Sequence, residues 1–121
     1  MSLMRNPNAP HIDFTELYGI AGKCVPSNID MVYERNGFFL VGEWKRENER
    51  ISIGQEILLK QMARQPRFVV LIVSGDTDDG MKVTEFSVIK SDGTKKVLGT
   101  SLDAFKRFIK WWFDEIAEKN K

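Results

Sequence analysis

Apolar residues follow two different periods along the 121-residue chain, and each period predicts its own kind of element. Residues 68–74 open with an unbroken apolar run, which is typical of a strand buried on both faces. Residues 28–35 and 38–45 are rich in β-branched, aromatic and aliphatic side chains and favour strands. Asn36-Gly37 lies between these two runs and supplies two residues that tolerate positive φ. We therefore expect a hairpin with a type I′ turn.

Three other segments carry apolar residues at helical spacing. We expect helices over residues 14–23, 52–64 and 102–118. Ser52 followed by Gln55 fits a capping box at the start of the second helix. The apolar stripes are expected to be Phe14, Leu17, Tyr18 and Ala21 in the first helix, Ile53, Ile57, Leu58 and Met62 in the second, and Leu102, Phe105, Ile109, Trp112 and Ile116 in the third.

The remaining patterns complete the predicted fold. Residues 83–90 and 95–98 indicate a second hairpin that turns at 91–94. The element order is then α-β-β-α-β-β-β-α, and a strand that follows a helix favours a parallel crossover. The sequence predicts an α/β (α+β) fold, a mixed β-sheet flanked by helices.

Length and composition limit the function classes. The length predicts one domain over residues 13–121, preceded by a flexible leader over residues 1–12. Hydrophobic residues make up 42% and charged residues 29% of the chain, which is ordinary for a globular domain. A formal net charge of +1 argues against a globally basic nucleic-acid binder. Local basic patches remain open, because electrostatic steering depends on where the charges lie.

Cys24 and His11 are the only cysteine and the only histidine. The chain therefore has no internal disulfide and no cysteine-based zinc site, and a Ser-His-Asp triad is disfavoured. Any metal would be held by oxygen ligands. The sequence has no apolar run near the ~20 residues of a membrane span, and its first eight residues lack the apolar core of a signal peptide. We expect a cytoplasmic protein with no membrane partner.

The first predicted hairpin brings a constellation of charged residues together. A two-residue turn at Asn36-Gly37 pairs positions whose numbers sum to 73, so Asp30 faces Glu43 and Lys45 points to the same face. Two carboxylates directly opposite each other repel. A shared proton, a nearby cation or a bound metal would offset this repulsion. Two carboxylates, a backbone carbonyl and water suit Mg²⁺ or Mn²⁺.

Ser-Asn-Ile-Asp30 followed by Gly-Glu43-Trp-Lys45 resembles the signature of the PD-(D/E)XK nuclease superfamily, which includes restriction endonucleases, Holliday-junction resolvases and virus-type replication-repair nucleases. The resemblance spans residues 16–74 and includes the order helix, hairpin with the acids, helix, strand. Gln55 follows Lys45 at the place where several branches carry an active-site glutamine. Glu16 stands where some branches keep a further acid. Ile29 departs from the pattern, since it replaces the name-giving proline.

This resemblance implies a restriction endonuclease-like core and a metal-dependent endonuclease that hydrolyses DNA. Asp30 and Glu43 would bind Mg²⁺ with the backbone carbonyl of Trp44, and Lys45 would orient the attacking water. Gln55 would support the site or the phosphate. We expect structure-selective or weakly specific cutting, by a homodimer or by one component of a larger complex.

Plainer interpretations stand beside each of these roles. Asp30, Glu43 and Lys45 could form a solvated hairpin face with a Glu–Lys ion pair. Gln55 could be only the third residue of a capping box, and Glu16 only an exposed helix residue. The basic residues near the motif could bind phosphates or belong to a solvated, mixed-charge face; they are Arg46, Arg50, Lys60 and Arg64. The alternative function is a non-catalytic nucleic-acid- or protein-binding module on the same fold.

Overall fold

The computed structural model describes residues 15–22, 29–46, 49–78 and 80–118. Its elements are η1 (Thr15–Leu17, a 3₁₀ turn), β1 (Met31–Arg35), β2 (Phe38–Lys45), α1 (Ile53–Ala63), β3 (Phe68–Asp76), β4 (Lys82–Ile89), β5 (Lys95–Gly99), α2 (Leu102–Trp111) and η2 (Trp112–Ala117, a π-helix that continues α2). The predicted leader, residues 1–12, lies outside the described residues.

The five strands form one mixed sheet in the order β1-β2-β3-β4-β5. β2 and β3 are parallel and are joined through α1, so the predicted crossover is confirmed, whereas the other neighbours are antiparallel. Asn36 and Gly37 have φ values of 56° and 81°, as a type I′ turn requires. Val32 pairs with Val41 and Arg35 with Phe38, which is the predicted register.

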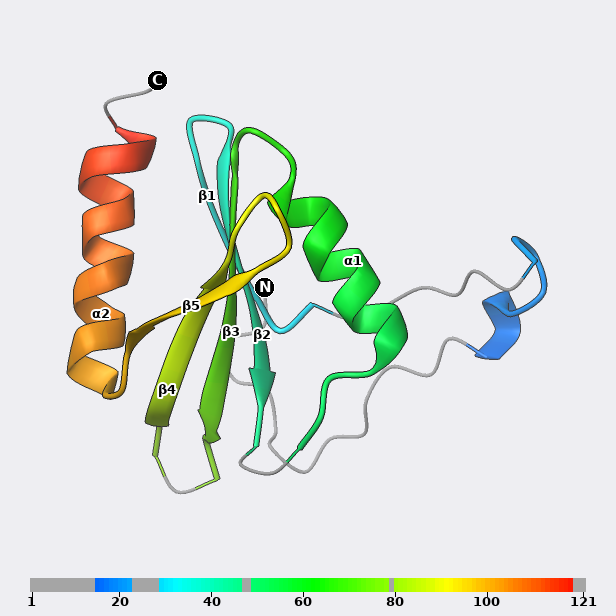
Figure 1. The fold of residues 1–121 in the computed structure, drawn as a ribbon, viewed down its shortest axis with the longest axis horizontal. Helices are drawn as coiled ribbons and strands as arrows, with labels where there is room; N and C mark the ends of the chain where they lie inside the picture. Colours follow the sequence, from blue (N-terminus) through cyan, green and yellow to red (C-terminus); the bar gives the residue numbers. More distant parts are fainter. Residues whose placement is uncertain (1–14, 23–28, 47–48, 79, 119–121) are drawn as a thin grey trace.

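The sheet lies between two helical layers (Figure 1), with α1 on one side and α2 with η2 on the other. Successive residues of a strand point to opposite faces, and β3 shows this division clearly. Leu71 and Val73 belong to the cluster under α2, whereas Val70 and Ile72 belong to the cluster under α1. The long apolar run of β3 is explained by this burial on both faces.

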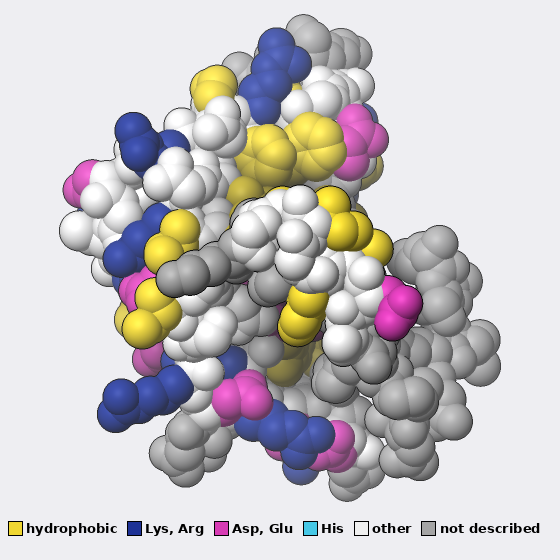
Figure 2. Space-filling model, turned by 90° about the vertical axis from the view of Figure 1, so that its right-hand side faces the viewer, with side chains coloured by type: hydrophobic (Ala, Val, Ile, Leu, Met, Phe, Trp, Pro, Cys, Tyr) yellow, Lys and Arg dark blue, Asp and Glu magenta, His cyan; other side chains and the backbone are white. Residues whose placement is uncertain are grey.

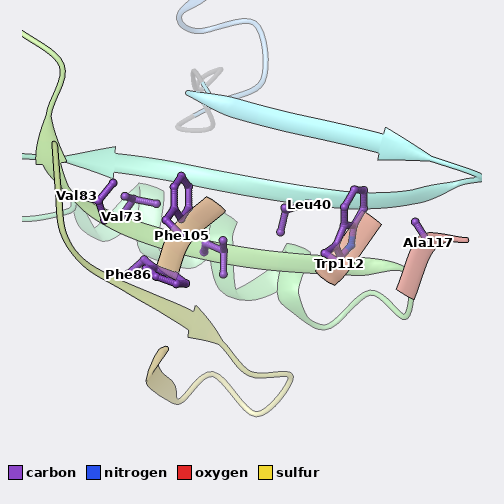
Figure 3. Packing of buried hydrophobic residues seen from close by; sticks show 8 residues of the cluster. Leu40, Val73, Val83, Phe86, Phe105, Trp112 and Ala117 are labelled. Atoms are coloured by element: carbon purple, nitrogen blue, oxygen red, sulfur yellow. The ribbon is translucent and has the colours of Figure 1, made fainter. Parts of the chain in front are cut away.

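The α2 side holds the larger cluster. Phe105 and Trp112 from the helical layer meet Leu40, Val73 and Phe86 from the sheet, and Figure 3 shows these side chains gathered between the two layers. Ser101 caps α2, since its hydroxyl accepts a hydrogen bond from the Ala104 N–H. The predicted apolar seam of this helix is confirmed: Leu102, Phe105, Ile109, Trp112 and Ile116 all pack in or against the cluster.

Hydrogen bonds join the tip of the β1–β2 hairpin to η2. Arg35 donates to the Phe113 carbonyl at 2.9 Å and also pairs with Glu118. Asn36 donates its side-chain N–H to the Ala117 carbonyl at 3.0 Å. These bonds join the hairpin tip to the backbone of η2.

The predicted stripe of α1 is wrong in part. Leu59 and Ala63 are the buried residues of this helix, whereas Ile53 and Ile57 are exposed. Several apolar stripes overlap on one helix at 100° per residue, and only the position of the sheet decides between them. The predicted cap holds, since Ser52 accepts a hydrogen bond from the Gln55 N–H at 3.1 Å.

The predicted helix over residues 14–23 is also wrong in its extent. The structure forms only the 3₁₀ turn Thr15–Leu17, in which no residue is buried. Gly19 and Gly22 adopt φ values of 87° and 66°, a conformation that cannot continue a right-handed helix. An amphipathic pattern this short needs a packing partner to become helical, and η1 buries nothing. Among the described residues, no helix has the length and apolar character needed to span a membrane.

Candidate active site

Asp30 and Glu43 meet at the open end of the first hairpin. The β1–β2 ladder ends at the pair Met31–Gly42, so Asp30 and Glu43 occupy the next position of the same register. Asp30 continues the hairpin through its side chain, because its Oδ2 accepts a hydrogen bond from the Trp44 N–H at 2.8 Å. A carboxylate therefore replaces a backbone carbonyl at this point of the strand pair.

Glu43 is buried, which is unusual for a carboxylate. Its exposed fraction is 7%, and it shares the α1 side of β2 with Val41. Gln55, in the first turn of α1, donates its Nε2–H to Glu43 Oε1 at 3.2 Å. The parallel crossover creates this contact, because it returns the chain over β2 and places the start of α1 beside the end of that strand.

The environment of Glu43 favours its protonated form. Burial is the main cause that raises the pKa of Glu43 from 4.5 to about 8, and the charge and hydrogen bond of Asp30 add to it. The charge of Glu49 acts in the same direction, whereas the hydrogen bond from Gln55 opposes the shift. At neutral pH the Asp30–Glu43 pair therefore holds a proton, which a bound cation would displace.

The backbone of Trp44 adds a third oxygen to this edge. Arg35 and Phe38 flank a two-residue turn, so Phe38 and every second residue after it direct both backbone polar groups toward β1. Trp44 belongs to this set, and its N–H does bond Asp30 on that side. Phe39 belongs to the other set and donates its N–H to the Arg67 carbonyl on the β3 side, at 2.8 Å. The Trp44 carbonyl thus points to the edge at which Asp30 lies.

This donor set consists of two carboxylates and a backbone carbonyl. Within the described part of the chain, no group of three or more His, Cys, Asp or Glu side chains gathers in metal-binding positions. A cation at Asp30 and Glu43 would therefore complete its shell with the Trp44 carbonyl and water, which is a coordination that Mg²⁺ accepts.

Lys45 is the last residue of β2 and is half-buried. Strand alternation puts its side chain on the same face as Glu43, and its parallel neighbour is Ser74 of β3. No ion pair joins Glu43 to Lys45 among the ion pairs of the described residues. The pairing partners of Glu43 are Gln55 and Asp30 instead.

Gln55 makes only half of the predicted capping box. Its backbone N–H bonds the Ser52 hydroxyl, but its side chain turns to Glu43 rather than back to the cap. The residue thus links the helix start to the buried carboxylate.

The structure distributes the four candidate phosphate-binding residues around the site rather than gathering them. Arg46 forms an ion pair with Asp78, in which Nη2 lies 2.9 Å from Oδ1 and Nη1 lies 2.8 Å from Oδ2. Lys60 pairs with Glu56 at 3.3 Å, and at 100° per residue Lys60 and Arg64 lie far around α1 from Gln55. Arg50 is exposed. Figure 2, which views the side of α1, shows Lys and Arg side chains interspersed with acidic and apolar ones.

Glu16 is not brought to this site. It lies in the exposed turn η1, and Figure 1 shows residues 15–22 standing apart from the sheet, beyond α1.

Neither a family model, nor a curated protein, nor a solved structure matches this chain. The account of the site therefore rests on its own geometry.

Two residues near the site were missed from the sequence. Asp78 lies more than 30 positions from Arg46, in a polar loop that carried no signal for a specific ion pair. Glu49 accepts a hydrogen bond from the Arg46 N–H at 3.1 Å, and its charge acts on Glu43. Both residues of this contact lie in the charged run at 46–50, three positions apart, but the run alone did not single them out.

Proposed function

We propose that this chain is a small metal-dependent nuclease of the PD-(D/E)XK type, which hydrolyses phosphodiester bonds in DNA. The observation that carries the proposal is the buried carboxylate Glu43, opposed by Asp30 and held by Gln55. A surface carboxylate needs no such arrangement. A buried carboxylate beside a second carboxylate is costly unless a proton or a cation accompanies the pair.

The donor chemistry supports Mg²⁺ or Mn²⁺ as the accompanying cation. All the candidate ligands are hard oxygen donors: Asp30, Glu43 and the carbonyl of Trp44. When bound, such a cation supplies positive charge for the phosphate and lowers the pKa of a bound water. The Trp44 N–H keeps the Asp30 carboxylate at the strand edge, and Gln55 orients the Glu43 carboxyl.

Lys45 supplies the remaining charge. Its ammonium lies on the Glu43 face at the end of β2, where it can hold a water for attack and stabilise the negative charge that develops on the phosphate. The carboxyl ends of the parallel strands β2 and β3 lie at this same edge of the sheet, and the crevice outside such ends is a common position for ligand sites.

The arrangement of elements agrees with the resemblance noted in the sequence. The acids lie on a hairpin, a helix with Gln55 follows, and a buried parallel strand comes next. The first helix of the pattern is reduced to one 3₁₀ turn, and Glu16 stands apart. Our proposal therefore assigns no role to Glu16. Because the domain is small, we expect structure-selective or weakly specific cutting.

The second candidate is a non-catalytic nucleic-acid- or protein-binding module. One observation favours it: Arg46 and Lys60 are committed to internal ion pairs rather than to an open basic surface. Such a module would have no use for a cation at Asp30 and Glu43, so metal binding separates the two candidates.

Calorimetric titration with Mn²⁺ provides this test. The wild-type chain is expected to bind Mn²⁺, and Asp30→Ala and Glu43→Gln are expected to lose that binding. Asp103→Asn, an exposed acid in the first turn of α2, serves as the matched control and should bind as the wild type does.

A cleavage assay then tests the chemistry. Linear, single-stranded and branched DNA are incubated with Mg²⁺, and Lys45→Ala is expected to abolish cleavage while it keeps Mn²⁺ binding and the circular dichroism spectrum. Lys106→Ala, on the exposed side of α2, is the control. Cleavage that persists in both Lys45→Ala and Glu43→Gln would contradict the proposal.

A further inference from the structure

Two segments of this chain expose apolar side chains, although the helical spacing of these residues predicts that they are buried. The first is the outer face of α1, where Ile53 is 78% and Ile57 is 57% exposed. A Cβ built on Gly54 meets nothing within 4 Å, so this face is open. Ile53 and Ile57 are four residues apart and form one continuous apolar strip along the helix.

The second is the segment 15–22. Leu17, Tyr18 and Ile20 are all exposed, and Ile20 reaches 76%. Gly19 and Gly22 also have nothing within 4 Å of a built Cβ. Three large apolar side chains within four residues form a patch of the kind that marks an interaction site.

The charges of the two surfaces are complementary. Arg64 continues the strip of Ile53 and Ile57 seven residues after Ile57 and is exposed, whereas Lys60 on the same side pairs with Glu56, so the outer face of α1 is apolar at its start and carries an exposed arginine at its end. Glu16 precedes Leu17 in the segment, which places an acid beside the apolar patch. An apolar centre with opposite charges at its rim is the usual composition of a protein interface.

We infer that residues 15–22 of one copy dock on the outer face of α1 of a second copy, and that the exchange is reciprocal in a twofold dimer. Within one chain the two surfaces do not meet, because Figure 1 shows residues 15–22 standing clear of α1. The outer face of α1 in a second copy can approach residues 15–22 directly, because the two segments are then not joined by one chain. Two equivalent contacts then form at once, as a closed twofold interface requires.

The inference is independent of the proposed function. Ile53 and Ile57 lie on the side of α1 away from Gln55, so the dimer leaves the edge with Asp30 and Glu43 open. Its tests need neither metal nor DNA.

The first test measures the mass of the full chain in solution by sedimentation and light scattering. We expect a dimer that dissociates on dilution. Ile57→Asp and Ile20→Asp should each yield a monomer with an unchanged circular dichroism spectrum. Met81→Asp, at a half-exposed apolar residue outside both surfaces, is the matched control and should leave the dimer intact. A monomeric wild type, or a dimer that survives Ile57→Asp, overturns the inference.

The second test places the contact between copies. Cys24 is replaced by serine, and one copy carrying Ile20→Cys is mixed with another carrying Ile57→Cys under mild oxidation. A covalent dimer of the two different copies is expected, and Met81→Cys in place of Ile57→Cys should give none. An intrachain disulfide in a chain carrying both cysteines, formed at high dilution, would show that the segment packs on its own α1 and would overturn the inference. A monomer in which Ile57→Asp weakens oligonucleotide binding would assign the strip to nucleic acid instead.

Discussion

The two faces of the sheet bury different chemistry. On the α2 face the side chains are large and aromatic, and Phe86, Phe105 and Trp112 are almost completely excluded from solvent. On the α1 face the cluster is smaller and mostly aliphatic, and the same face buries Glu43 further along β2. Aromatic packing on the first face fixes the strands, so that the second face can hold a carboxylate that destabilises the fold when ionised.

A single strand carries both faces. Along β2, Leu40 and Trp44 point to the aromatic cluster, whereas Val41 and Glu43 point to α1. Trp44 packs edge-on against Phe105, with ring centroids 5.9 Å apart. The residue between the proposed catalytic Glu43 and Lys45 therefore anchors the strand from its opposite side.

The largest effect is expected from a substitution that disrupts the aromatic face alone. Phe86→Ala removes a buried ring that meets Phe105 and Phe108, and such truncations cost about 3–5 kcal/mol of unfolding free energy. Urea denaturation followed by circular dichroism measures this loss. The milder Phe86→Leu should remain folded and should bind Mn²⁺ as the wild type does. A loss under about 1 kcal/mol for Phe86→Ala would contradict the role of this face.

The next effect comes from the other face and depends on pH. Because the pKa of Glu43 is about 8 in the folded chain and about 4.5 when unfolded, the folded state holds the extra proton between these values. The contribution of Glu43 to the free energy of unfolding is therefore fully present below pH 4.5, and it is lost as the pH rises toward 8. Each pKa unit corresponds to about 1.4 kcal/mol, so the loss is a few kcal/mol.

Urea denaturation at a series of pH values checks this dependence with Glu43→Gln as the comparison. The amide stays neutral, so the variant should lack this slope and should be more stable than the wild type at pH 8. Equal slopes for both proteins would show that Glu43 is not the group responsible.

A smaller effect is expected at the contact between the two elements of the site. Gln55→Leu removes the donor that opposes the pKa shift of Glu43, so that pKa should rise further. A hydrogen bond of this kind contributes about 1 kcal/mol. The pH dependence of stability measures the change, and Gln61→Leu, on the exposed side of α1, is the matched control. The prediction fails if both variants titrate alike.

The smallest effect concerns the exposed pair Arg46–Asp78. Exposed ion pairs contribute between about 0 and 1 kcal/mol to stability. Arg46→Ala should therefore lower the free energy of unfolding by at most about 1 kcal/mol, and this change should be seen only at low salt, because salt screens the pair. Thermal unfolding at two salt concentrations provides the measurement. A large, salt-independent loss would show that Arg46 supports the site structurally.

Local rules were sufficient where the local signal was strong. Asn36-Gly37 determines the turn, the turn determines the register, and the register brings Asp30 opposite Glu43. Ser52 was identified as a cap because its hydroxyl needs only the next turn of its own helix. These features depend on residues that are close in sequence or related by strand pairing.

The features that the sequence could not provide depend on distant elements. The buried stripe of α1 is decided by where the sheet lies, and the apolar periodicity at Ile53 and Ile57 does not contain that information. The side chain of Gln55 bonds Glu43 instead of its own helix cap, and this choice depends on the packing of α1 against β2. Residues 15–22 have a helical pattern, but without a covering surface in this structure the chain forms only one turn.

The central claim is that the buried Glu43 and the exposed Asp30 beside it form a carboxylate pair that exchanges its proton for a divalent cation. Carbon-13 NMR of the labelled Glu43 carboxyl group measures this directly, as a titration without and with Mg²⁺. Without the cation, the account predicts a pKa of about 8, and with saturating Mg²⁺ it predicts an ionised carboxylate throughout the neutral range. A Glu43 that titrates near its ordinary pKa of 4.5 and does not respond to Mg²⁺ would contradict the account.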